Sequence, residues 1–197
     1  MFKRLILTLV NSFALSMILR MQIITPKATS KTILFGVKVP RDAEYYKEVQ
    51  ELYEEYDKIS KIVGAIALII LSILVFYFYN IKFQLLSILL YIALLFLIYL
   101  RSNYKARKLK KEKNWDKMDS KVIIVDKDET LEFQTKSEDD LWKLGNTIYC
   151  NSEDISLFVK KRYGTGWTIN IGRPLGLILF LALLFGLSII IIKLIKL

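Results

Sequence analysis

The chain has 197 residues, of which 54% are hydrophobic and 24% are charged, and its 29 lysines and arginines outnumber 19 aspartates and glutamates. An ordinary soluble domain is less apolar than this, and a disordered chain far less so. The absence of histidine excludes Ser-His-Asp and Cys-His catalysis and histidine-ligated zinc. A single cysteine, Cys150, excludes an internal disulfide and any multi-thiolate metal site. Apolar and charged residues occupy separate stretches of the chain.

Residues 1–25 form the first apolar segment, with an uncharged core from Leu5 to Leu19. Polar side chains recur at a spacing of about four and place one polar stripe on a helix: Arg4, Thr8, Ser12, Ser16 and Arg20, with Asn11 beside them. Two placements fit this pattern, a spanning helix whose stripe faces other helices or an interfacial helix that lies flat. We predict the spanning helix, because Met21 to Ile24 extend its apolar length.

Residues 26–61 are predicted to form a strand followed by an amphipathic helix. Alternation over 33–39, closed by Pro40, indicates the strand. Asp42 is a candidate N-cap for the helix, whose apolar stripe consists of Tyr45, Val49, Leu52, Tyr56, Ile59 and Val63. This face needs a partner, either the second hydrophilic domain of the same chain or another chain in coiled-coil-like pairing.

Three uncharged runs are long enough to cross a bilayer: Ile62–Asn80, Phe83–Leu100 and Pro174–Ile192. At ~1.5 Å per residue each run spans close to the ~30 Å hydrocarbon core. The link between the first two is too short to leave the membrane surface. We therefore predict a transmembrane hairpin over 62–101 and a C-terminal transmembrane helix over 174–197.

Residues 102–117 continue a polybasic run that begins at Arg101 and holds eight bases against two acids. Such a run beside a membrane helix attracts anionic lipid headgroups, at ~1 kcal/mol per basic residue. The predicted headgroup contacts are Arg101, Lys105, Arg107, Lys108, Lys110, Lys111 and Lys113. Nucleic-acid binding is disfavoured, because lipid phosphate is the nearer anion.

Residues 118–173 are predicted to form a small β-rich domain. Val122–Val125 and Thr130–Phe133 indicate a hairpin, and 141–149, 156–162 and 167–171 indicate three further strands. About 55 residues form only a marginally stable domain, so packing against the amphipathic helix or the headgroups would stabilise it. The predicted fold class is a membrane α-helical protein with four transmembrane helices and a small cytoplasmic β-rich (α+β) domain.

Positive charge sets the predicted orientation. Residues 26–61 hold seven lysines and arginines and residues 101–173 hold sixteen, against five on the opposite side. This asymmetry places both large hydrophilic connections, 26–61 and 102–173, in the cytoplasm of a multi-pass cell-membrane protein.

No constellation of residues indicates catalysis or a cofactor. The three uncharged runs contain no ionisable acid or base, which disfavours an ion-coupled carrier. The acidic pairs and the Asp126–Glu129 turn lack the spacing of a calcium loop, and Gly164-Thr165-Gly166 lacks a full phosphate-binding motif. We predict no metal, no cofactor and no enzymatic activity.

Two blocks of the sequence resemble a known family. Asp139-Asp140-Leu141-Trp142-Lys143-Leu144-Gly145 and the stretch from Leu157 to Asn170 are similar to a domain of unknown function in bacterial, largely Gram-positive, membrane proteins. Its pattern is roughly D-D-x-x-W-K-x-G, then F-V-x-K-R-x-G-x-G-W-T-x-N, before a membrane helix. Leu34–Pro40 is similar to the L-F-G-V-R-[IV]-P stretch of such proteins. The resemblance implies membrane location and a loose association with Sdp-type immunity and signalling proteins, with no transferable functional residues.

The first functional hypothesis is a non-enzymatic regulatory, sensor or immunity-type membrane protein that docks a protein partner, or a second copy of itself, through its cytoplasmic domain. The predicted docking residues are Tyr45, Val49, Leu52, Tyr56, Trp142, Phe158 and Trp167. The alternative is an accessory subunit of a membrane transporter, using the Asn11/Ser12/Ser16 face. A lipid-acting enzyme that uses Asp139, Asp140 and Glu153 at the headgroup level is a third hypothesis.

Overall fold

The computed structural model describes residues 1–115 and 138–196. Four of the helices in these two ranges are long and apolar enough to cross a membrane: α1 (Phe2–Ala28), α2 (Lys47–Phe78), α3 (Ile81–Glu112) and α5 (Pro174–Lys196). This confirms the predicted set of four long apolar helices. The hairpin predicted over 122–133 lies outside the described residues.

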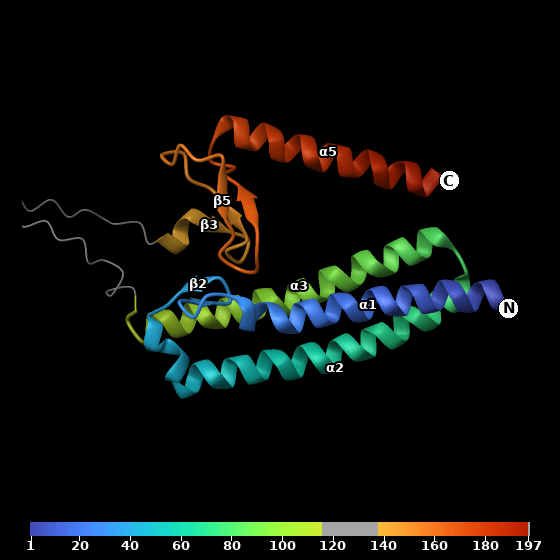
Figure 1. Ribbon diagram of the computed structural model, residues 1–197, viewed down its shortest axis with the longest axis horizontal. Helices are drawn as coiled ribbons and strands as arrows, with labels where there is room; N and C mark the ends of the chain where they lie inside the picture. The colour runs from blue at the N-terminus through green and yellow to red at the C-terminus, as the bar shows by residue number, and fades with distance from the viewer. Residues whose placement is uncertain (116–137, 197) are drawn as a thin grey trace, which may run out of the picture.

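Helices α1, α2 and α3 lie side by side in a three-helix bundle (Figure 1). The predicted amphipathic helix and the first uncharged run form one continuous helix, α2. At its end Tyr79 adopts a left-handed φ of 44°, and the Asn80 side chain caps α3 by accepting a 2.8 Å hydrogen bond from the Lys82 backbone N–H. A two-residue link therefore closes the hairpin.

Two residues of the polar stripe of α1, Asn11 and Ser12, contact the neighbouring helices, whereas Arg4 and Arg20 are exposed. The Ser12 hydroxyl donates to Ser72 of α2 at 2.8 Å, and Ser87 of α3 donates to the buried Asn11 at 3.0 Å. Helix–helix hydrogen bonds of this kind contribute about 0.6 to 2 kcal/mol in a bilayer. Helix α1 thus packs along α2 and α3 as a member of the bundle.

The segment predicted as a single strand over 33–39 is instead a tight hairpin of β1 (Ile33–Leu34) and β2 (Val37–Lys38). The chain turns at Phe35 and Gly36, whose φ angles are 46° and 84°. Alternation is misleading here, because Phe35 is buried in the core and packs at a tilt against the rings of Tyr53 and Tyr56, with ring centres 5.2 and 4.8 Å away.

The predicted N-cap at Asp42 is also wrong. Asp42 lies within a short 3-10 helix, η1 (Arg41–Tyr45). Helix α2 begins only at Lys47, with Tyr46 in the N-cap position and no side-chain hydrogen bond there. The 3-10 turn fits Ala43 into the core beneath it.

The C-terminal unit is built from η2 (Glu138–Leu141) and two small hairpins. The first pairs β3 (Trp142–Lys143) with β4 (Ile148–Tyr149), and the second pairs β5 (Phe158–Lys160) with β6 (Trp167–Ile169). A bridge between Tyr149 and Asn170 joins them. The single strand predicted over 141–149 is thus a hairpin, because residues 144–146 all have a positive φ.

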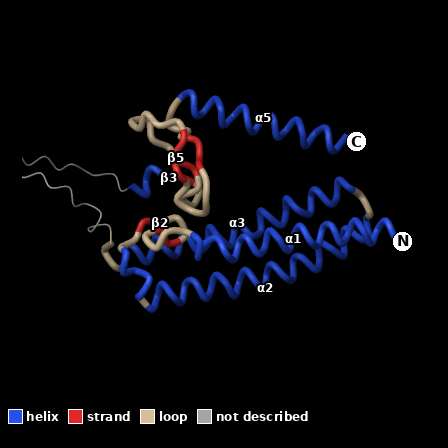
Figure 2. Tube along the Cα trace, viewed as in Figure 1, coloured by secondary structure: helices blue, strands red, loops and turns tan. Residues whose placement is uncertain are grey.

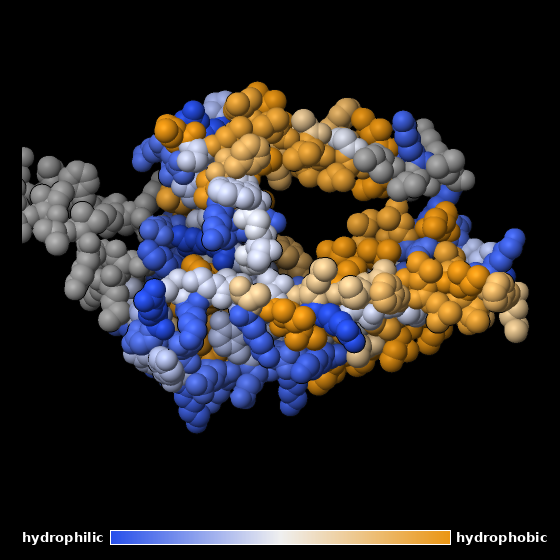
Figure 3. All heavy atoms as spheres, viewed as in Figure 1, coloured by the Kyte–Doolittle hydropathy of each residue, from blue (hydrophilic) through white to orange (hydrophobic). Residues whose placement is uncertain are grey.

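Helix α5 follows β6 and stands apart from the bundle (Figures 1 and 2). Most of its described side chains are exposed, and a Cβ added at Gly186 would meet no atom within 4 Å. Figure 3 shows open space between α5 and the bundle, and apolar surface over the parts of the helices far from the strands. The polar surface gathers at the end where the strands lie.

Candidate docking site

The C-terminal unit is fixed to the bundle where two turns meet on α3. Asn103 donates to the backbone oxygen of Phe35 at 2.7 Å and to that of Gly145 at 3.2 Å. The Tyr99 hydroxyl lies 2.5 Å from the same Gly145 oxygen. Asn146 closes the junction by donating to the Gly36 oxygen at 2.8 Å. Residues more than a hundred positions apart are therefore held together by one face of α3.

Asp139 is the ionic centre of this junction. Its carboxylate accepts a 2.7 Å hydrogen bond from Lys110 Nζ of α3 and a 3.2 Å bond from the Lys38 backbone N–H of β2. It also pairs with Arg162, in the β5–β6 turn. The side chains of Lys110 and Asp139 are only 4% and 8% exposed. A buried carboxylate thus balances two buried cations, a geometry in which removing one partner is costly.

Arg162 adds an aromatic contact to this centre. Its guanidinium lies 5.3 Å from the centre of the Trp142 ring and bonds Glu138 at 3.0 Å. Trp142 itself stacks against Tyr149 across the β3–β4 hairpin at 5.0 Å. Arginine is suited to this position, because its flat guanidinium stacks and forms ion pairs at the same time.

The predicted lipid-contact residues divide into two groups. Arg101 and Lys105 bond Glu55 at 2.9 and 2.6 Å, and Lys113 bonds Glu48 at 2.5 Å. These pairs tie α3 to α2, and they lower the pKa of both glutamates, chiefly through the lysine hydrogen bonds. The other four line a hollow of about 470 Å³ beside Asp139: Arg107, Lys108, Lys110 and Lys111. Lys110 is buried there and Arg107 bonds Asn146.

The structure divides the predicted docking residues into buried and exposed ones. Four of them are buried within the chain: Val49, Leu52, Tyr56 and Trp142. The apolar face of α2 therefore packs inside the same chain, mainly against the β1–β2 hairpin, α1 and α3. Three predicted docking residues remain exposed, namely Tyr45 at 76%, Phe158 at 53% and Trp167 at 67%. Cys150 is half-buried.

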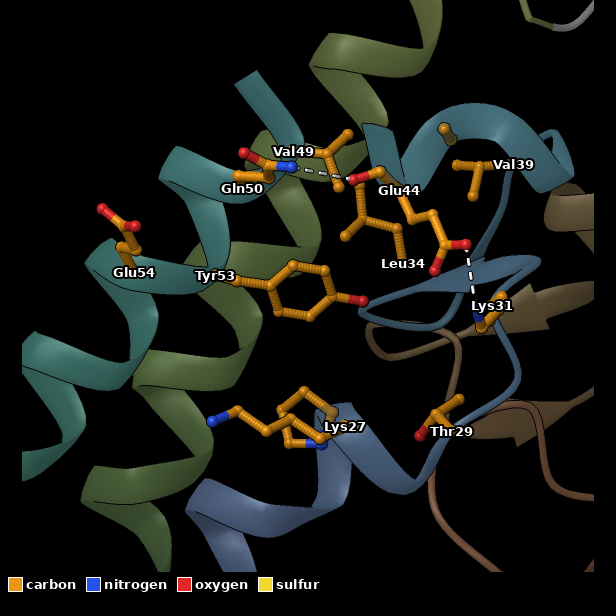
Figure 4. A pocket seen from close by; sticks show the side chains of 12 residues that line it. Lys27, Thr29, Lys31, Leu34, Val39, Glu44, Val49, Gln50, Tyr53 and Glu54 are labelled. Atoms are coloured by element: carbon orange, nitrogen blue, oxygen red, sulfur yellow. Dashed lines mark hydrogen bonds and ion pairs between the residues drawn. The ribbon is translucent and has the colours of Figure 1, made fainter. Parts of the chain in front are cut away.

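An open pocket of about 430 Å³ lies where the end of α1, η1 and the start of α2 converge (Figure 4). Its apolar lining comes from Leu34, Val39, Ala43, Val49 and the ring of Tyr53. Its rim is charged, with Lys27 and Lys31 from the α1 end of the chain and Glu44 and Glu54 from η1 and α2. Figure 4 shows the Tyr53 side chain extending across the pocket from α2.

The Lys31–Glu44 ion pair stands at one side of this pocket, with 2.8 Å between Nζ and Oε1. Their hydrogen bond raises the pKa of Lys31 and lowers that of Glu44, and burial raises the pKa of Tyr53. Both members of the pair also line a neighbouring hollow of about 680 Å³ that includes the exposed Tyr45. The two hollows therefore meet at this ion pair. We call the two hollows together the α1–η1–α2 groove.

The groove offers binding chemistry. Its apolar floor, tyrosine hydroxyl and rim of both charges suit an amphipathic peptide segment better than a small anion. Sequence periodicity identified Tyr45 and Val49 but not the lysines and glutamates around them. The lysines and acids are spread from residue 27 to residue 54 with no motif spacing, so only the fold brings them together. Among residues 1–115 and 138–196, no group of three or more metal-binding side chains occurs.

The comparisons with known proteins cover a small part of the chain. Residues 153–177 match a family model described as Family of unknown function (DUF5808), a stretch that includes β5, β6 and the start of α5. Searches of curated proteins and of solved structures found no match. The matched stretch contains the whole of the second block that suggested a domain of unknown function, Leu157 to Asn170, and continues into the following helix. These residues therefore form part of an uncharacterised domain.

Proposed function

We propose that this chain is a non-enzymatic, multi-pass membrane protein that docks a protein partner through the α1–η1–α2 groove on the cytoplasmic side. The observation that carries the proposal is the groove itself, an open apolar floor with a charged rim at the polar end of four apolar helices. In a regulatory, sensor or immunity-type role, a cytoplasmic segment of the partner would bind in this groove.

Membrane insertion follows in this proposal from the surface of the helices. Side chains such as Ile66, Ile69 and Ile73 on α2 and Leu183 and Phe185 on α5 are exposed. In water these surfaces would form apolar patches far larger than a monomer tolerates. In a bilayer they contact lipid, and the basic segments then favour a cytoplasmic location for the strands and the groove.

The proposal changes the predicted role of the basic run. Helix α3 continues straight past the end of its uncharged run at Leu100. Lys110 is ten residues further on, so it stands ~15 Å above that level if α3 runs along the membrane normal. Attraction to headgroups decays within ~8–10 Å. We therefore assign lipid contact to the Arg101 end of the run and the role of holding the fold together to the Lys110 end.

Site-specific photocrosslinking in native membranes tests the docking. A photoreactive phenylalanine analogue replaces the exposed Tyr45 in the groove, and in a control it replaces Glu51, which is exposed on α2 outside the groove. We expect an adduct of defined mass from position 45 only, weakened by the additional change Glu44→Arg. The same adducts from both positions, or none from position 45, would refute docking in this groove.

A further inference from the structure

A second cavity, of about 290 Å³, lies between the bundle and the β5–β6 hairpin. Ile18 of α1 and Ile92 and Phe96 of α3 give one end an apolar lining, and Gln22 of α1 lies beside them with its amide donating to the Leu95 oxygen. The other end is polar and is lined by Lys161, Thr147 and Asn146. The cavity is therefore amphiphilic along the direction of the helices.

Lys161 is the free donor at the polar end. The Asn146 amide donates to the Gly36 oxygen, and the Thr147 hydroxyl donates to the Leu144 oxygen at 2.6 Å. Tyr99, which also lines the cavity, has its hydroxyl bonded to the Gly145 oxygen. Within residues 1–115 and 138–196, no carboxylate forms an ion pair with the exposed Lys161. An anion at this end would meet an uncompensated ammonium group.

The cavity lies at the membrane depth where the headgroup of a lipid meets its acyl chain. Tyr99 is next to the last residue of the uncharged run of α3, and Ile92 lies seven residues deeper. Seven residues of α-helix correspond to ~10 Å. The polar end is thus level with the membrane surface, and the apolar end reaches into the hydrocarbon region.

The β5–β6 hairpin carries exposed aromatic residues toward the same level. Phe158 pairs with Ile169 and Lys160 pairs with Trp167, so all four share one face of the hairpin. Ile169 lies against the first turn of α5, where its Cγ2 atom is 3.3 Å from the Cβ position of Gly176. The exposed Phe158 and Trp167 therefore lie on the face of the hairpin that also carries Ile169 against the first turn of α5. Tryptophan at such a level is typical of the membrane interface.

We propose that this cavity binds one anionic phospholipid, with its phosphate at Lys161 and the upper part of an acyl chain along Ile92 and Phe96. A lipid fits both ends of the cavity, whereas a free phosphate would leave the apolar end empty. The inference rests on the membrane placement within the proposed function and is independent of partner docking.

Lipid retention by the full-length chain tests the site. The protein is reconstituted in vesicles of phosphatidylglycerol and phosphatidylcholine in equal amounts, extracted in mild detergent and examined by native mass spectrometry. Lys161→Glu should lower retained phosphatidylglycerol about fivefold or more, since each basic residue near a bilayer contributes ~1 kcal/mol. Lys160→Glu, the same charge change on the neighbouring residue outside the cavity lining, should lower retention less than Lys161→Glu does. Millimolar inorganic phosphate should displace none of the lipid.

A second pair of variants addresses the apolar end without changing charge. Ile92→Trp fills the cavity and should lower retention, whereas Ile69→Trp on the exposed side of α2 should not. Equal retention by all four variants and the wild type overturns the lipid site, and so does displacement by inorganic phosphate. Release of the chain from membranes by alkaline carbonate would refute the membrane placement itself, which separates that failure from failure of the lipid site.

Discussion

At the scale of single residues, Asp139 holds three separate segments of the chain together. It binds a lysine of α3, an arginine of the β5–β6 turn and a backbone N–H of β2. None of these partners is close to it in sequence. A carboxylate of this kind holds separate segments in one arrangement because each cation is buried and has to be neutralised.

We expect Asp139→Asn to destabilise the protein by about 3–5 kcal/mol, because the buried Lys110 would lose its 2.7 Å ion pair and Arg162 would lose one of the two carboxylates that it contacts. Thermal unfolding of the full-length protein in detergent measures this effect. Asp140→Asn is the matched control, since Asp140 is exposed, and it should change stability by less than about 0.5 kcal/mol. Equal effects of the two substitutions would contradict the role of Asp139.

Glu55 gives a prediction about pH. The Lys105 hydrogen bond lowers the pKa of Glu55 below its ordinary value. A lowered folded-state pKa stabilises the protein above the ordinary pKa of glutamate, and this contribution is lost as the pH falls through the lowered value. Glu55→Gln should therefore lower the melting temperature near neutral pH and flatten its decline from about pH 5 to about pH 3.

Glu51→Gln is the control for this titration, because Glu51 lies exposed on the same helix and pairs only along it, with Lys47 at 3.6 Å. The Glu55 pair is partly exposed, so the expected effect is small and weaker at high salt. Melting curves that decline in parallel for Glu55→Gln and wild type would rule out a contribution from this pair.

At the scale of elements, the two glycine turns on α3 decide how the halves of the chain meet. Gly36 has a φ of +84°, and a Cβ there would lie 2.8 Å from the Tyr99 hydroxyl and 2.9 Å from Cβ of Asn146. Gly36→Ala therefore combines backbone strain with a collision inside the junction. We expect a loss of more than about 2 kcal/mol in thermal unfolding.

Gly166→Ala separates the cost of backbone strain from the cost of the collision inside the junction. Gly166 also has a positive φ, of +102°, but a Cβ there would meet nothing within 4 Å. This variant should show only the backbone cost of about 1–2 kcal/mol. A loss at Gly166 as large as that at Gly36 would show that contacts with α3 add nothing.

Sequence patterns predicted helices well and turns poorly, for a physical reason. A long uncharged run or a stripe of spacing three and four is a property of many residues, so α2, α3 and α5 were predictable. The strands over 33–39 and 141–149 were predicted without their turns, because a few residues with positive φ reverse the chain. Phe35 and Leu144 are such residues, and neither type favours that conformation outside a tertiary setting.

The candidate site was less predictable than the fold. Tyr45 was identified from helical periodicity, but the pairing of Lys31 with Glu44 depends on how η1 folds back over the end of α1. The basic run was identified as a compositional feature. That Lys110 neutralises a carboxylate 29 residues away could not be read from spacing, since the contact forms only when the C-terminal unit docks.

At the scale of the whole molecule, the described strands lie toward one end of the long apolar helices (Figures 1 and 2). The α2–α3 link lies at the opposite end (Figure 1). If the helices span a bilayer, Cys150 and residue 82 must lie on opposite sides of it. The positive-charge asymmetry predicts that the Cys150 side faces the cytoplasm.

A membrane-impermeant maleimide tests both statements on intact cells that express the chain. The half-buried Cys150, the single cysteine, should react only after the cells are opened. In the variant Cys150→Ser with Lys82→Cys, the exposed residue 82 should react on intact cells. Labelling of Cys150 alone on intact cells would invert the orientation and place the groove outside. Labelling of both positions on intact cells would refute a spanning bundle. If α2 and α3 cross the bilayer, their two-residue link and the polar end of α2 lie on opposite sides of it, so only one of the two positions can face the outside.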